Sequence, residues 1–483
     1  MSVFGSVLVA NRGEIAVRII RACRDLGLRS VAVYSDADRD ALHTKLADAA
    51  VRIGPAPAGE SYLDLDRIMA AARETGAQAI HPGYGFLAED PRLAQACAAA
   101  RIAFIGPPAE AISAMGDKVR ARQRMQAEGV PVLPGTEAVA DLDQAHAAVR
   151  EMGLPVLVKA VAGGGGIGVK EVHDEQELRP ALETCSVLAQ RFFGDSRVFL
   201  ERLVTDPRHI EVQILADSHG NTIHLGEREC SIQRRHQKLV EEGPAPAISE
   251  EMRRALGDAA VRAAQAVGYV NAGTVEFIVS QGSFYFLEMN TRLQVEHPVT
   301  ELLTGIDLVA AQLRVAMGEP LPWRQDQVEW RGWALECRVN AEDPWMDFLP
   351  TPGRVTAYHE PAGPGVRADS SLSGGGQVSP FYDPLIAKLI VHGASREEAV
   401  ARARRALFEY WIGGITSNIP FHAALLEDSD FLAGRLTTEY IANHPQLLVR
   451  AQAWRERQAE AMSQLGSNRR RLAAMAAALT ASQ

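Results

Sequence analysis

The segment from residue 274 to residue 289 constrains the fold most, because it predicts a β-hairpin that carries acidic side chains into a core. Thr-Val-Glu-Phe-Ile-Val (274–279) and Phe-Tyr-Phe-Leu-Glu-Met (284–289) are rich in the β-branched and aromatic residues typical of strands. A three-residue loop centred on Gly282 joins them and places Glu276 opposite Glu288. The alternate positions are apolar, which indicates that the hairpin packs in a core; they are Val275, Phe277, Leu287 and Met289.

The polar face of this hairpin predicts a metal site. Two carboxylates that face each other across a sheet repel, so a buried pair needs a cation between them. Mg²⁺ prefers carboxylate and amide oxygens and completes its shell with phosphates. We expect Mg²⁺ or Mn²⁺ at Glu276, Glu288 and Asn290, whereas the alternative is a solvated polar face. If the chain stays extended, the same face continues through Arg292, Gln294 and Glu296.

Composition limits the class of protein. A chain of 483 residues exceeds one compact core, so two or three domains are expected. The net charge of -10 argues against a general nucleic-acid partner or an anionic membrane surface. The five cysteines lack C-x-x-C spacing, and neither a basic leader nor a long apolar run is present. We therefore expect a cytoplasmic protein with free thiols, no membrane span and no zinc site.

The N-terminal segment predicts a doubly wound α/β unit. An apolar strand at 6–10 leads into Asn-Arg-Gly-Glu (11–14), then a helical pattern and a second strand at 30–34. Because G-x-G-x-x-G is absent, we expect a Rossmann-like layer without a dinucleotide. Gly83 and Gly85, in the segment HPGYGF, follow a strand end, where backbone can approach a ligand.

A glycine-rich loop follows the strand at 154–159. Successive glycines can turn several N–H groups toward one anion, and Lys159 adds a point charge. The alternative is a flexible linker, but well-patterned strands flank the loop on both sides. We expect a lid over a nucleotide; its glycines are Gly163, Gly164, Gly165, Gly166 and Gly168.

Three separate motifs resemble the biotin carboxylases of the ATP-grasp superfamily. They are HPGYGFLAED (81–90), RRHQKLVEE (234–242) and EMNTRLQVEHPVTE (288–301), within a match from about the N-terminus to about residue 445.

The resemblance implies an α/β and α+β multidomain fold. Its expected parts are an N-terminal Rossmann-like parallel sheet at 1–114, a central ATP-grasp domain at 115–333 with a lid at about 132–204, a C-terminal mixed α+β domain at 334–446, and a helical or disordered tail at 447–483.

The resemblance implies ATP and Mg²⁺ (or Mn²⁺) as cofactors, with bicarbonate as a substrate. It places Lys118 and Lys159 on the phosphates, with the glycine loop closing over them. It assigns Glu201 to the exocyclic amine of adenine and Leu203 to its ring. It assigns ribose and phosphate contacts to His209, Gln233 and His236.

The resemblance also implies residues for bicarbonate and biotin. Lys238 and Arg292 gather bicarbonate, helped by Gln294 and the Val295 backbone, and an arginine fork suits such a planar anion. Glu296 removes the bicarbonate proton as a general base. After carboxyphosphate breaks down, Arg338 stabilises the biotin enolate, and Tyr84 lies near the biotin ring system.

The expected partners are a biotin carboxyl carrier protein and carboxyltransferase subunits, because no A-M-K-M lysine motif occurs in this chain. A homodimer is also expected, and acetyl-CoA is the expected final acceptor, with pyruvate or another acyl-CoA as the alternative.

Two other hypotheses remain: an ATP-grasp ligase that transfers activated bicarbonate to an amine, and a non-catalytic subunit. The second has one hint, since Ile167 stands where the family usually has a basic residue.

Overall fold

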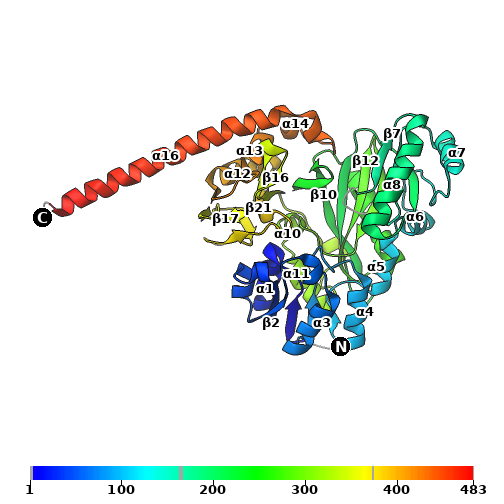
Figure 1. Ribbon diagram of the computed structural model, residues 1–483, viewed down its shortest axis with the longest axis horizontal. Helices are drawn as coiled ribbons and strands as arrows, with labels where there is room; N and C mark the ends of the chain where they lie inside the picture. The colour runs from blue at the N-terminus through cyan, green and yellow to red at the C-terminus, as the bar shows by residue number, and fades with distance from the viewer. Residues whose placement is uncertain (1–3, 163–166, 373–374, 482–483) are drawn as a thin grey trace.

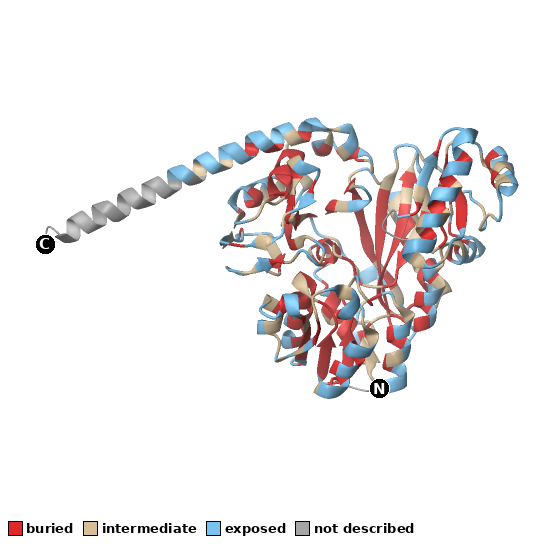
Figure 2. Cartoon of the chain, viewed as in Figure 1, coloured by how far each residue is buried: buried red, intermediate tan, exposed pale blue. Residues whose placement is uncertain are grey.

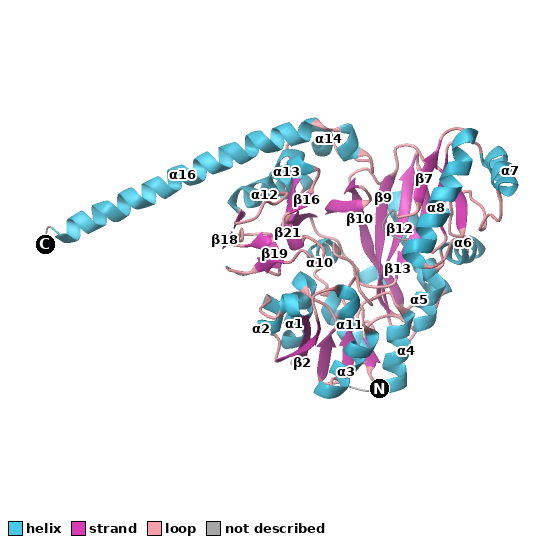
Figure 3. Ribbon diagram, in the orientation of Figure 1, coloured by secondary structure: helices cyan, strands magenta, loops and turns pink. Residues whose placement is uncertain are grey.

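The computed structural model describes residues 4–162, 167–372 and 375–481. Two large sheets lie at its centre, and helices cover their outer faces (Figures 1 and 3). The multidomain α/β fold class is therefore confirmed. Figure 2 shows that the buried residues follow the strands and the inner faces of the helices.

The N-terminal part is a five-stranded parallel sheet in the order β3-β2-β1-β4-β5. Its strands are β1 (Ser6–Val9), β2 (Arg29–Ser35), β3 (Ala49–Gly54), β4 (Ala79–His81) and β5 (Ala103–Phe104). The helices of this part are α1 (Gly13–Asp25), α2 (Leu42–Leu46), α3 (Leu65–Thr75), α4 (Pro91–Ala100) and α5 (Ala109–Gly116). The strand–turn–helix pattern predicted from the sequence is confirmed, and the carboxyl ends of β1 and β4 lead directly into the site described below.

The second sheet is antiparallel and has eight strands in the order β13-β12-β9-β10-β11-β14-β21-β19. The strands are β9 (Arg208–Ala216), β10 (Thr222–Arg234), β11 (Gln237–Gly243), β12 (Asn271–Ser280), β13 (Ser283–Asn290), β14 (Trp333–Asn340), β19 (Val366–Ser370) and β21 (Leu385–Gly393). Helices α9 (Glu250–Ala266), α10 (His297–Thr304) and α11 (Leu308–Ala316) pack around it. The sheet runs unbroken from β11 into β14, so residues on both sides of position 333 share one surface.

The predicted hairpin is present, but its loop is shorter than expected. Ser280 pairs with Ser283, so only Gln281 and Gly282 form the turn, and both have positive φ (49° and 77°). A two-residue loop alone would place Glu276 opposite Leu287, but a β-bulge after Glu276 shifts the register by one residue. Glu276 therefore faces Glu288 as predicted, although the three-residue loop was wrong.

A small layer stands beside the large sheet, at the upper right of Figure 1. Its three antiparallel strands lie in the order β7-β6-β8: β6 (Val156–Ala160), β7 (Val169–Val172) and β8 (Val198–Arg202). Helices α7 (Leu142–Met152) and α8 (Leu178–Phe193) close its own apolar core around Val158 and Leu200, and α6 (Lys118–Ala127) leads into it. Residues 163–166 of the predicted glycine loop lie outside the described residues.

The C-terminal part packs helices against the far end of the large sheet. The helices are α12 (Arg396–Glu409), α13 (Ile419–Leu425), α14 (Ser429–Leu432), α15 (Tyr440–Asn443) and α16 (Gln446–Ala481). Short strands complete it: β15 (Glu342–Asp343), β16 (Leu349–Pro350), β17 (Gly353–Arg354), β18 (Ala357–His359), β20 (Gln377–Val378) and β22 (Trp411–Gly413). The first turns of α16 bury Leu447, Ala451 and Trp454 in this core, and the helix then extends away from the body (Figure 1).

All five cysteines are free, as expected, and all are buried. Within the described residues, no helix is both long enough and apolar enough to cross a membrane.

The base of α16 contributes to stability through Trp454, which is 5% exposed and meets the Phe408 ring edge-to-face at 6.1 Å. We expect Trp454→Ala to lower the free energy of unfolding by about 3 kcal/mol, because it leaves a cavity in the C-terminal core. Thermal denaturation followed by circular dichroism measures the effect. Val449→Ala, on the exposed side of the same helix at 73% exposure, is the matched control. Equal midpoints for the two variants would contradict the packing described for α16.

Candidate active site

A cleft of about 1220 Å³ lies where the N-terminal sheet, the small layer and the large sheet meet. It gathers nearly every residue that the sequence predicted for a site. Those lining it are Tyr84, Lys118, Lys159, Glu201, Leu203, His209, Gln233, His236, Lys238, Glu276, Glu288, Asn290, Arg292, Gln294, Val295, Glu296 and Arg338. Gly168 is not among the lining residues, and Gly163, Gly164, Gly165 and Gly166 lie outside the described residues.

Lys238, on β11, is the central cation of the cleft. Its ammonium lies 2.5 Å from Glu211, 3.0 Å from Glu276 and 2.7 Å from Glu296. Burial alone would raise the pKa of Glu276 and of Glu296, but the polar and charged groups around them, Lys238 first among these, together outweigh burial and hold both pKa values well below their usual range. These carboxylates are therefore ionised at neutral pH.

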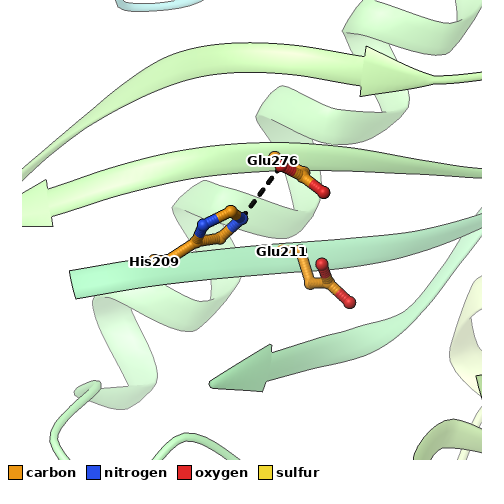
Figure 4. Close-up of side chains that lie close together, drawn as sticks. All are labelled: His209, Glu211 and Glu276. Atoms are coloured by element: carbon orange, nitrogen blue, oxygen red, sulfur yellow. Dashed lines mark ion pairs between the residues drawn. The ribbon is translucent and has the colours of Figure 1, made fainter. Parts of the chain in front are cut away.

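Glu276 has polar neighbours at both oxygens. His209 lies 2.9 Å from one of them (Figure 4). The amides of Asn290 and Gln294 donate to the other, at 2.9 Å and 2.7 Å. The carboxylate is thus oriented by groups from β9, β13 and the segment that follows β13.

The structure places cations of the chain itself beside the two acids. The Lys238 ammonium lies 3.0 Å from Glu276, and the Lys118 ammonium lies 3.0 Å from Glu288. The side chain of Glu288 is 32% exposed, so water screens part of its charge. The chain therefore supplies its own cations, which sequence spacing does not reveal because Lys118 and Lys238 come from distant segments.

The predicted extended ridge also differs from the structure. β13 ends at Asn290, the chain bends, and Glu296 stands at the N-cap position of α10, where its side chain makes no capping bond. Arg292 reaches back to Asn290 at 2.8 Å and is held by Glu89 at 2.8 Å. The polar residues after 290 meet in one cluster because the bend and α10 fold them inward, not because they continue a strand.

The donor set still fits a hard divalent cation. One oxygen of Glu288 has no hydrogen-bond partner among the described residues, the Glu288 backbone pairs with that of Glu276, and Asn290 lies two residues further along β13; carboxylate and amide oxygens of this kind suit Mg²⁺. A second group, formed by His209, Glu211 and Glu276, has ligand atoms within 4.8 Å of one another (Figure 4). Lys238 already bonds two of its carboxylates, so a cation there would compete with an ammonium.

Arg338, on β14, joins two carboxylates. Its guanidinium donates to Glu241 at 2.6 Å and to Glu296 at 2.9 Å. Burial raises the pKa of Glu241 to about 7, although Arg338 acts to lower it. Glu296 thus lies between the cations of Lys238 and Arg338.

The other end of the cleft contains the residues predicted for a nucleotide. Lys159, on β6, lies 2.8 Å from Glu201, two residues along β8 from its directly paired residue Phe199, whose ring centre is 5.7 Å from the Lys159 ammonium. The amide of Gln233 lies 3.3 Å from His209, which connects this end to Glu276. His236 occupies the turn between β10 and β11 with a positive φ of 64°.

Several residues that build the site were missed. Arg228 is fully buried on β10 and bonds Glu211 at 2.6 Å and Gln294 at 3.0 Å, and Glu241 and Glu89 hold the two predicted arginines. A signal existed in β9, where His209, Glu211 and Gln213 alternate with apolar residues and so share the face of Glu276. The sequence around Arg228 shows no comparable alternation, so only the three-dimensional structure identifies Arg228 as part of the site.

We expect Arg228→Met to lower the free energy of unfolding by about 3–5 kcal/mol, because it leaves buried polar groups without their donor. Arg324→Met, which breaks the exposed pair with Asp326, is the control and should shift the midpoint little. Chemical denaturation of both variants beside the parent compares them. An unchanged midpoint for Arg228→Met would show that the buried network does not support the fold.

Three family profiles match consecutive parts of the chain. They are described as biotin carboxylase, N-terminal domain (residues 3–112), carbamoyl-phosphate synthase L chain, ATP binding domain (117–324), and biotin carboxylase C-terminal domain (336–443).

Curated relatives agree with these profiles. A pyruvate carboxylase subunit from Methanothermobacter thermautotrophicus is 53% identical, over 91% of this chain and 89% of its own length. Biotin carboxylase 1 of Bacillus subtilis is 51% identical, over 91% of this chain and 98% of its own length.

Solved structures agree as well. The biotin carboxylase domain of Hydrogenobacter thermophilus 2-oxoglutarate carboxylase, in complex with MgADP, ADP and bicarbonate, has a TM-score of 0.90 and 46% identity. A biotin carboxylase–β-γ-ATP complex from Campylobacter jejuni gives the same TM-score of 0.90 and 46% identity. Each alignment covers 92% of this chain and 99% of the other. The chain therefore belongs to the biotin carboxylase family, a family of ATP-dependent ligases.

Proposed function

We propose that this chain carboxylates biotin on a separate carrier protein, with ATP and bicarbonate as co-substrates and carboxyphosphate as the intermediate. One observation carries the proposal furthest: Glu296 lies ionised between the cations of Lys238 and Arg338 inside a single cleft. A general base and two groups that bind anions are thereby held together before any substrate arrives.

ATP binding is proposed for the part of the cleft between the small layer and the large sheet. Lys118, Lys159, Glu201, Leu203, His209, Gln233 and His236 all line it. Glu276, Glu288 and Asn290 would hold Mg²⁺, or Mn²⁺, against the phosphates. The metal would neutralise charge on the transferred phosphoryl group, a step that depends almost entirely on positioning and electrostatics. The two similar structures named above, crystallised with MgADP and with β-γ-ATP, support this assignment.

Bicarbonate binding is proposed beside Lys238. An anion that attacks a phosphate needs cations to gather it, and the two candidates are Lys238 and Arg292, with Gln294 and the Val295 backbone nearby. Glu296 takes the bicarbonate proton as an oxygen of bicarbonate attacks the γ-phosphorus and ADP leaves. Its pKa is depressed while both cations face it, and their engagement with bicarbonate would raise its basicity.

Biotin carboxylation follows in the same cleft. Carboxyphosphate breaks into CO₂ and phosphate, phosphate takes the proton from the ureido nitrogen, and that nitrogen bonds to CO₂. Arg338 offsets the negative charge on the ureido oxygen. Tyr84, from the loop after β4, is proposed near the biotin rings because it lines the cleft on the side of the N-terminal sheet.

The proposal includes the expected partners and parts. A biotin carboxyl carrier protein and carboxyltransferase subunits would complete the reaction, and the chain would act as a homodimer. The relatives act in pyruvate, propionyl-CoA and 2-oxoglutarate carboxylases, so acetyl-CoA as final acceptor stays a prediction. The boundaries 1–114, 115–333, 334–446 and 447–483 are likewise proposed, with the lid at about 132–204.

The reaction itself is tested by ADP release from the full chain with Mg²⁺, ATP, bicarbonate and free biotin. We expect release to fall to background when Mg²⁺ or bicarbonate is omitted, and to rise when biotin is added, because carboxyphosphate is then consumed. Dependence on bicarbonate without any response to biotin would instead favour transfer to an amine. Nucleotide binding without turnover would favour a non-catalytic subunit.

The roles of Glu296 and Arg338 are tested by alanine substitution. Glu296→Ala should lower the rate of biotin carboxylation about 10²–10⁴-fold, the usual contribution of a general base, and Arg338→Ala should abolish it. ATP binding should survive in both, because neither residue lies at the nucleotide end. Transfer of labelled bicarbonate to biotin and calorimetric titration with ATP measure the two quantities. Parental rates in either variant would refute the assigned role.

A further inference from the structure

Two motifs that the proposed mechanism leaves unused meet at one peptide of the site. Lys388, from the segment YDPLIAKL on β21, donates from its ammonium to the Val295 carbonyl at 2.8 Å. Glu14, from the segment NRGE at the start of α1, lies 3.2 Å from the same ammonium. Lys388 is fully buried and Glu14 is 3% exposed. Neither residue is among those assigned to substrate above.

The position of Val295 makes this contact significant. It lies between Gln294, which donates to Glu276, and Glu296, which pairs with Lys238 and Arg338. Its backbone is also proposed to face bicarbonate. Within the described part of the chain, no backbone donor bonds the Val295 carbonyl, so the side chain of Lys388 is what fixes this peptide.

Burying the Lys388 ammonium to bind one carbonyl has a high desolvation free energy. A neutral donor would satisfy the oxygen without the cost of burying a charge. The ammonium is retained by Glu14 and, at 4.0 Å, by Asp369 on β19. The charge therefore ties Val295 to the N-terminal unit and to the far strands of the large sheet at once.

Glu14 also reaches the proposed biotin side. The Tyr84 hydroxyl donates to its second oxygen. Other charged groups near this carboxyl are Lys388 and Asp369, together with Arg367 on β19. One carboxyl thus connects the residue proposed at biotin with the lysine that fixes the bicarbonate segment.

We propose that Lys388 and Glu14 are positioning residues that hold the Val295 peptide in the orientation that binds bicarbonate. Lys388 acts on Val295 directly, and Glu14 keeps Lys388 and Tyr84 in place. This inference rests on the proposed function and deepens it. It assigns part of the recognition of bicarbonate to two residues that do not contact a substrate themselves.

The experiment measures the KM for bicarbonate, the KM for ATP and kcat in ADP release by the full chain. We expect Lys388→Met to raise the KM for bicarbonate on the order of tenfold, the effect of losing a hydrogen bond from a charged donor. The KM for ATP should change less than about twofold, since the nucleotide end of the cleft does not contact Lys388. Lys388→Arg, which keeps a charged donor, should recover part of the loss.

Asp369→Asn is the matched control. It removes a buried charge from the same network, where Asp369 also accepts from Arg367, but it leaves the donor to Val295 in place. We expect a lower thermal midpoint with a bicarbonate KM within about twofold of the parent. A rise equal to that of Lys388→Met would mean that general loosening, not positioning, is responsible, and would overturn the inference.

Glu14→Gln keeps the inference testable if Lys388→Met does not fold. It preserves an acceptor for Tyr84 but removes the charge that retains Lys388, so the KM for bicarbonate should rise by a smaller factor. Unchanged KM values in both Glu14→Gln and Lys388→Arg, with a parent that needs bicarbonate, would contradict positioning by this pair. A parent whose ADP release ignores bicarbonate would contradict the proposed function itself.

Discussion

The site depends on one buried ammonium among three carboxylates. Lys238 pairs with Glu211, Glu276 and Glu296, which come from β9, β12 and the start of α10. Each of these acids would destabilise the fold if it were buried alone, because an isolated charge is costly to remove from water. The register of the neighbouring strands brings Glu211 and Glu276 to this cation, and the bend before α10 adds Glu296, so the same contact stabilises the sheet and builds the site.

The two acidic residues of the hairpin are paired with lysines of the same chain. Lys118 covers Glu288 and Lys238 covers Glu276 without any ligand. Both carboxylates are therefore paired with a cation of the chain and oriented in advance, which reduces the reorganisation that binding requires. A divalent cation that bound these carboxylates would compete with the two ammonium groups. Lys118 lies at the more exposed end of the acidic hairpin, because its partner Glu288 is partly exposed whereas Glu276 is buried.

Sequence patterns and motifs predicted most of the residues that line the cleft, but they did not predict the contacts and backbone geometry that bring those residues together. The opposition of Glu276 and Glu288 followed from strand alternation, although a bulge and a two-residue turn, rather than a three-residue loop, produce it. The parallel N-terminal sheet followed from its strand–turn–helix pattern. Motif resemblance placed Arg338 and Lys238 in the cleft, which periodicity could not do across about 100 residues.

What could not be predicted are the contacts between distant segments. Arg228, Glu89 and Lys388 have their effect through partners 17 to 203 residues away, and no local spacing encodes such pairs. The bend after Asn290 was equally hidden, because the residues that follow it alternate as they would in a strand. The helix α10 that follows has local signals, Pro298 in its first turn and Gly305 at its end, but the contact between Glu296 and Lys238 joins residues 58 positions apart.

The central claim is that the acidic hairpin is already neutralised by lysines and receives a divalent cation only together with a nucleotide. Electron paramagnetic resonance of Mn²⁺, titrated into the full chain with and without ADP, tests it most directly. The account predicts weak binding without ADP, tight binding of Mn²⁺ with ADP, and loss of that tight binding in the Glu276→Gln/Glu288→Gln double variant. Tight Mn²⁺ binding without nucleotide, or binding with ADP that the double variant retains, would contradict it.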